Sequence, residues 1–126
     1  MPTDPEEEVA AKALAGHRRF LKRVAATQHV WGLQAEPGVW AYCESNEFED
    51  TEVLLFWGYK EDAAKLAIDD WADYEPATIP LDDLVDNWLP GMLEDGLLVG
   101  TNWTAQLTGY EIEPDELIEQ LHEALE

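Results

Sequence analysis

The chain has 126 residues, of which 46% are hydrophobic, so it can bury the core of one domain and is not a disordered chain. The chain contains 7 Lys and Arg residues and 28 Asp and Glu residues, which gives a formal net charge of −21. Because such a surface repels phosphate groups, we expect neither nucleic acid nor an anionic membrane as a partner.

Residue usage also predicts where the protein resides. The lone Cys43 cannot form an internal disulfide, so the fold needs no oxidising compartment. The longest uninterrupted apolar run, Val53–Trp57, is far shorter than the ~18 residues of a membrane span. The first residues are acidic and do not resemble a signal peptide. We therefore expect a cytoplasmic protein with a single domain over residues 1–126, whose acidic helix start lies at 1–8.

The first predicted element is an amphipathic helix that begins at Asp4-Pro5 and ends near Thr27. Its apolar residues recur at helical spacing, and its cations lie on the opposite side: Lys12, Arg18, Arg19, Lys22 and Arg23. This is the only basic element of the sequence. We expect it either to pair with acids of the later half or to support a weak, salt-sensitive homodimer.

The middle of the chain favours short strands and helices in turn. Strands are predicted at 30–33 and 39–43, joined as a hairpin by Glu36-Pro37-Gly38, and at 53–59, 97–103 and 109–112. Further helices are predicted from Lys60 to an end at Tyr74-Glu75-Pro76, from Leu81 through a kink or end at Pro90-Gly91 in a segment that closes at Asp95-Gly96, and from Pro114. Residues 78–80 are predicted as an extended lead-in to the second of these helices. This order predicts an α+β fold: a single, mostly antiparallel sheet of about five strands packed by about four helices.

The negative charge is concentrated in the second half of the chain. Residues 66–126 contain sixteen acids and no Lys or Arg, so no Lys or Arg salt bridge can form within that half. Three interpretations remain open: a solvated surface that aids solubility, a face that meets a basic protein, or a mimic of a phosphate array.

The sequence carries no catalytic signature that we recognise. It lacks a Gly-rich phosphate loop, a nucleophile elbow and the H-E-x-x-H pattern. His17 lies on the apolar face of the first helix, which is typical of a hydrogen-bonded core histidine. Cys43 alternates with Ala41 and Val39, which favours a small buried side chain. We expect no catalytic residue, no cofactor and no metal.

Aromatic residues on the predicted strands are the candidate binding residues. If some of them point to an open face of the sheet, they form a rigid platform rimmed by acids, which suits a basic peptide. If all point inward, they fill the core instead. The residues are Trp31, Trp40, Trp57, Tyr59 and Trp103.

Several segments resemble one family in their order of tryptophans and glycines: Phe56-Trp57-Gly58-Tyr59-Lys60-Glu61-Asp62, Tyr74-Glu75-Pro76, Asn87-Trp88-Leu89-Pro90-Gly91, Asp95-Gly96-Leu97-Leu98-Val99-Gly100-Thr101-Asn102-Trp103 and Gly109-Tyr110-Glu111-Ile112. They are similar to the small bacterial family catalogued as domain of unknown function 2750, over about residues 18–125. This resemblance implies a bacterial, cytoplasmic setting and a single α+β domain, and it supplies no catalytic residues.

These features together favour a non-enzymatic protein-binding module, immunity-like or adaptor-like, that meets a basic protein with an acidic, tryptophan-rich surface. The alternative is a small enzyme or ligand-binding domain with a pocket near the strand tryptophans. A nucleic-acid-mimicking inhibitor is the third possibility.

Overall fold

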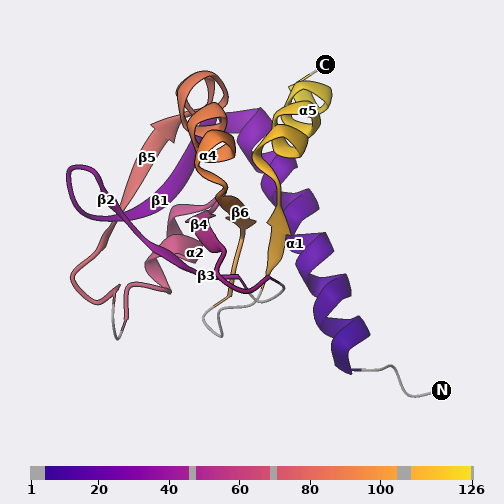
Figure 1. The fold of residues 1–126 in the computed structure, drawn as a ribbon, viewed down its shortest axis with the longest axis horizontal. Helices are drawn as coiled ribbons and strands as arrows, with labels where there is room; N and C mark the ends of the chain where they lie inside the picture. Colours follow the sequence, from indigo (N-terminus) through magenta and orange to yellow (C-terminus); the bar gives the residue numbers. More distant parts are fainter. Residues whose placement is uncertain (1–4, 46–47, 69–70, 105–108, 126) are drawn as a thin grey trace.

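The protein is described by a computed structural model over residues 5–45, 48–68, 71–104 and 109–125. Figure 1 shows the long helix α1 along one side, with α5 beside it and α4 next to α5. The elements in chain order are α1 Pro5–Thr27, β1 His29–Glu36, β2 Val39–Trp40, β3 Tyr42–Glu44, β4 Glu52–Phe56, α2 Lys60–Ala64, β5 Glu75–Pro80, α3 Leu81–Asp83, the π-helix η2 Leu84–Trp88, α4 Leu89–Asp95, β6 Leu98–Thr101, β7 Tyr110–Ile112 and α5 Pro114–Leu125.

The predicted α+β class is confirmed, but the single five-stranded sheet is wrong. The described strands form a three-stranded sheet in the order β2-β1-β5 and a four-stranded sheet in the order β3-β4-β6-β7. All described pairs are antiparallel except β4 with β6. Because α3, η2 and α4 follow one another without a break, the named helices of the described residues form four segments, close to the number expected.

The sheet divides because the hairpin strand changes partners at Ala41. The Ala41 N–H donates to the carbonyl of Leu33 in β1 over 2.9 Å, whereas the Ala41 carbonyl accepts from the Leu55 N–H in β4 over 3.4 Å. Just after β4, Trp57 forms an isolated antiparallel bridge with Trp31 of β1, with hydrogen bonds of 2.8 and 2.7 Å. The two sheets therefore meet at a corner, where strands commonly switch sheets.

Strand β5 differs from the prediction, which treated residues 78–80 only as an extended lead-in. Six residues, Glu75–Pro80, pair with β1 in antiparallel register. The strand contains Pro76 and Pro80, which argue against a central strand because proline cannot donate to the ladder. The order β2-β1-β5 places β5 at an edge, where proline is tolerated.

The helical segments also differ from the sequence pattern in two places. The helix expected to end at Tyr74-Glu75-Pro76 ends at Ala64, and Ile68 is exposed rather than on a buried face. The helix does not end at Pro90-Gly91 but continues to Asp95, and Gly96 caps it in the left-handed conformation, where the sequence predicts that the segment closes. The π-turn before Pro90 allows this continuation: the Leu89 N–H donates to the Leu84 carbonyl, so the spacing has already shifted before the proline.

The two faces of the four-stranded sheet bury different clusters. One cluster joins the face of Phe56, Val99 and Ile112 to α1, η2, α4 and α5. The other joins the opposite face to α2 and β1. Leu54 and Leu97 are only partly buried at the margin of the first cluster. In the described part of the chain, no helix has the length and apolar character needed to cross a membrane.

Candidate binding groove

Two of the five predicted binding residues lie inside the core. Trp57 and Trp103 are 0% and 2% exposed. The Trp57 Nε1–H donates to the carbonyl of Trp103 over 2.9 Å, and the Trp103 Nε1–H donates to the carbonyl of Tyr110 over 3.1 Å. Their indole groups are therefore satisfied within the fold. A partner could reach either side chain only by opening the core.

Two others contact cations of this chain. The guanidinium of Arg23 lies over the Tyr59 ring, 4.5 Å from its centroid, and the ammonium of Lys60 lies 6.0 Å from the centroid of Trp31. Both rings are half-buried. The faces that the prediction assigned to a basic partner are thus covered by cations from α1 and α2.

Trp40 is the fifth residue, and it lies on a different surface. Its ring packs edge-on against Trp88, with centroids 5.0 Å apart and an interplanar angle of 83°. It also covers Gly32, where an added Cβ would be 2.9 Å from the ring. These contacts fix Trp40 as a rigid wall. The structure therefore does not gather the five residues into one platform, and binding by the accessible ones stays a prediction.

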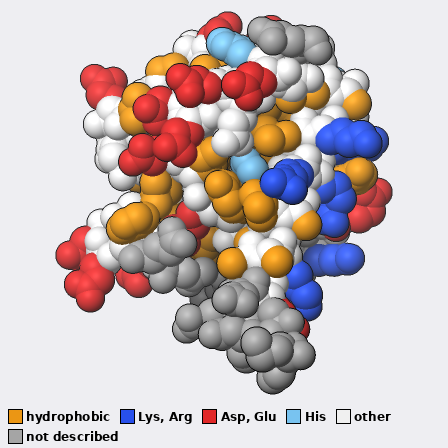
Figure 2. Space-filling view, turned by 90° about the vertical axis from the view of Figure 1, so that its right-hand side faces the viewer, with side chains coloured by type: hydrophobic (Ala, Val, Ile, Leu, Met, Phe, Trp, Pro, Cys, Tyr) orange, Lys and Arg blue, Asp and Glu red, His pale blue; other side chains and the backbone are white. Residues whose placement is uncertain are grey.

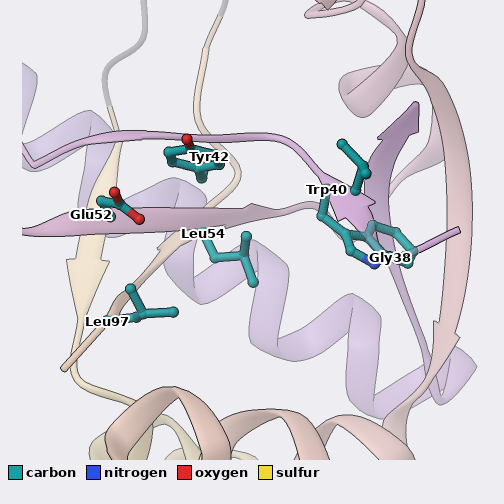
Figure 3. A pocket seen from close by; sticks show the side chains of 7 residues that line it. Gly38, Trp40, Tyr42, Glu52, Leu54 and Leu97 are labelled. Atoms are coloured by element: carbon teal, nitrogen blue, oxygen red, sulfur yellow. The ribbon is translucent and has the colours of Figure 1, made fainter. Parts of the chain in front are cut away.

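Trp40 borders a groove between the hairpin and the strand β4. Its cavity of about 350 Å³ is lined by Gly38, Val39, Trp40, Tyr42, Glu52, Leu54 and Leu97, which we call the β2–β3 groove. In Figure 3 Glu52 and Leu54 follow one another along β4, with Tyr42 on one side of them and Leu97 on the other. The walls are mainly apolar, and Tyr42 is 54% exposed. The groove can hold an apolar group beside one carboxylate.

Most groove residues were missed by the sequence analysis. Tyr42 sits between Ala41 and Cys43, which lie on the opposite face of a regular strand, so alternation alone would have placed it beside Trp40. The sequence did not indicate that Leu54 and Leu97 are accessible, because a run of apolar residues predicts a buried strand. Only the incomplete cover of the four-stranded sheet leaves them accessible.

A second cavity, of about 470 Å³, lies between α1, β7 and α5 and includes His17. His17 is 2% exposed, and its ring stacks on Tyr110 with centroids 4.2 Å apart. Its Nε2–H donates to Oε1 of Gln120 over 2.6 Å, and its Nδ1 accepts from the Thr101 hydroxyl over 2.8 Å. Burial lowers the pKa of His17, against a smaller opposing effect of the Gln120 hydrogen bond. His17 is thus a neutral, fully partnered core histidine, as the sequence predicts.

Comparison with protein families identifies one that matches most of this chain. The model of the family described as "Protein of unknown function (DUF2750)" matches residues 17–121. The chain belongs to this family. The resemblance noted in the sequence is therefore confirmed. No curated protein and no solved structure matches the chain.

In this DUF2750 protein the opposite charges occupy different regions. Five of the seven cations lie on α1, and Figure 2 shows Lys and Arg gathered on one side of the view while Asp and Glu gather on the other. Among the described residues, one ion pair forms: Arg19 with Asp62, at 3.9 Å. Ion pairs with Lys or Arg therefore offset little of the negative charge within the described residues. In the same residues no group of three His, Cys, Asp or Glu side chains is placed to hold a metal.

Cys43 provides a direct test of the structure of the DUF2750 chain. Burial, together with the carboxylates of Glu111 and Glu44, raises the pKa of the Cys43 thiol to about 11. At pH 8 about 0.1% of it is thiolate, against about a quarter of an ordinary thiol. We expect iodoacetamide to alkylate Cys43 about two orders of magnitude more slowly in the native protein than in the same protein unfolded by guanidinium chloride. A native rate that levels off below pH 9 would contradict this.

Proposed function

We propose that this protein is a non-enzymatic protein-binding module of the bacterial cytoplasm that holds an apolar and cationic segment of a basic protein in the β2–β3 groove. The observation that carries the proposal is the groove itself. It combines the exposed ring of Tyr42, the rigid wall of Trp40 and the carboxylate of Glu52 at one accessible site. Aromatic anchors beside a charged rim are typical of protein-binding surfaces.

The charge of the chain supports a cationic partner. The net charge is −21, and the described carboxylates form one ion pair with a Lys or Arg. Such a surface speeds encounter with a basic protein and slows encounter with an acidic one. The weak homodimer expected from the basic side of α1 stays a prediction, and sedimentation of the free protein tests it.

Affinity capture from a lysate of the native host tests the proposal. We expect the wild-type protein to retain a basic protein whose affinity falls several-fold between about 50 and about 200 mM salt. Tyr42→Ser should lose about tenfold or more in affinity, because it removes the exposed anchor of the groove.

Ile68→Ser is the matched control for this experiment. Ile68 is 50% exposed, close to the value for Tyr42, but it does not line the groove. It should bind like the wild type. If Tyr42→Ser binds equally well, or if the partner is neutral and insensitive to salt, the groove is not the binding site and the acidic surface serves solubility.

A small-ligand-binding domain is the second candidate, favoured by the volume of the cavity. About 350 Å³ falls at the lower end of small-molecule sites. A ligand of this kind would quench the fluorescence of Trp40 and raise the melting temperature without any partner protein. A saturable ligand whose binding is lost in Leu97→Ala would favour this candidate over the protein-binding module.

A further inference from the structure

The β3 strand beside the groove has an open edge. The Ala41 carbonyl and the Ser45 N–H both point toward β4, since the carbonyl accepts from the Leu55 N–H and the Ser45 N–H donates to the Thr51 carbonyl over 2.8 Å. In an antiparallel pair these directions alternate, so the N–H and C=O groups of Tyr42 and Glu44 point away from β4. The sheet order places β3 at the edge, and neither residue has a hydrogen-bond partner there within the described chain.

Two carboxylates face each other next to this edge. Glu44 and Glu52 are register partners across β3 and β4, as are Tyr42 and Leu54. All four side chains therefore lie on the same face of the sheet, which is the face of the groove. Like charges directly opposite one another, about 5 Å apart, destabilise a strand pair. Both glutamates are exposed, so a cation from outside can reach them.

We propose that the partner binds as an added β-strand along the open edge of β3. An aliphatic side chain of the partner packs on Tyr42 at the mouth of the groove. A Lys or Arg two residues away lies between Glu44 and Glu52, because alternate residues of a strand share a face. This inference rests on the proposed function and names the kind of segment that the groove recognises: an extended one with an aliphatic and a cationic residue in alternation.

The same glutamates select against other strands. An exposed edge pairs with any free strand unless charge prevents it, and acidic residues at the edge repel acidic chains. A second copy would bring its own Glu44 and Glu52 to that edge, and the net charge of −21 on each chain adds to the repulsion. A cationic strand instead removes the repulsion between Glu44 and Glu52. The edge is thus selective for a basic partner over a second copy.

A designed peptide tests the proposal without knowledge of the natural partner. The probe is acetyl-Thr-Arg-Thr-Leu-Thr-Arg-Thr-amide, which presents leucine flanked by arginine on one face in either strand direction. The comparison peptide, acetyl-Thr-Thr-Arg-Leu-Arg-Thr-Thr-amide, has the same composition but places leucine and arginine on opposite faces. Binding to the full-length protein is measured by fluorescence anisotropy at low and moderate salt.

Backbone methylation distinguishes strand addition from simple contact. In an antiparallel addition, residues opposite Tyr42 and Glu44 direct their side chains to the groove face and their N–H groups toward β3. In a parallel addition the N–H groups of the neighbouring residues point toward β3 instead. N-methylation of the leucine should therefore weaken antiparallel binding about tenfold or more, and N-methylation of an adjacent threonine should leave it nearly unchanged. The reverse is expected for parallel binding. On the protein, Glu44→Gln and Glu52→Gln should each weaken binding about threefold to fivefold at low salt. Glu119→Gln, which removes an exposed carboxylate from α5, should not.

The outcomes separate this inference from the proposed function. If both N-methylated peptides bind equally, the segment does not add as a strand, although the groove can still be the binding site. If neither designed peptide binds up to about 1 mM, or if both bind alike, the inference is overturned. The proposed function is then still judged by the effect of Tyr42→Ser on captured partners.

Discussion

Replacing Gly100 with alanine is expected to lower the free energy of unfolding by about 3–5 kcal/mol, through overpacking and the loss of buried hydrogen bonds. A Cβ at this position in β6 would lie 2.6 Å from Nε1 of Trp103 and 2.8 Å from Cδ2 of Leu55. The Trp103 ring would have to move. It would then break its hydrogen bond to the Tyr110 carbonyl and disturb the one from Trp57.

Gly91→Ala is the matched control, measured by thermal and urea unfolding. Apart from its chain neighbours and the backbone of its own helix, no described atom lies within 4 Å of a Cβ at Gly91, which belongs to α4. Because alanine is a better helix former, this variant should gain about 0.5–1 kcal/mol. If the free energy of unfolding of Gly100→Ala lies within about 1 kcal/mol of the wild-type value, Trp103 does not pack on β6 as described.

Acidification is expected to destabilise the protein through His17. Burial holds the pKa of folded His17 below its ordinary value, whereas the unfolded chain binds a proton at about pH 6.5. As the pH falls below about 6.5, the unfolded state takes up the proton first, so this contribution to stability is complete above that pH. It is lost as the pH falls through the folded pKa.

Comparison with His17→Gln isolates this effect from the carboxylates, which titrate in both proteins. The variant should be less stable than the wild type by about 2–4 kcal/mol at pH 7.5, because it leaves Thr101 and Gln120 imperfectly paired. The difference should shrink toward pH 5. His122→Gln removes an exposed imidazole and serves as the control. If the free energies of unfolding of the wild type and His17→Gln change in parallel with pH, His17 is not a buried neutral group.

Local sequence patterns determined the family, the fold class and most elements. The helical spacing of apolar residues identified α1 to its last turn, and it placed His17 on the buried side. Pro37-Gly38 marked the hairpin between β1 and β2, where Gly38 has a φ of 86°. These features depend on residues close together in the chain, so the sequence carries them directly.

Only the tertiary structure decided where the sheet divides and which aromatic residues are accessible. Alternation specifies the two faces of a strand, but it cannot specify the sheet to which each strand belongs. In the folded chain Ala41 switches partners between β1 and β4, and Trp57 and Trp103 are buried in the core. Trp40 and Tyr42 line the groove, and Glu44 lies opposite Glu52. Long-range register controls all of these contacts, and register depends on packing between segments far apart in sequence.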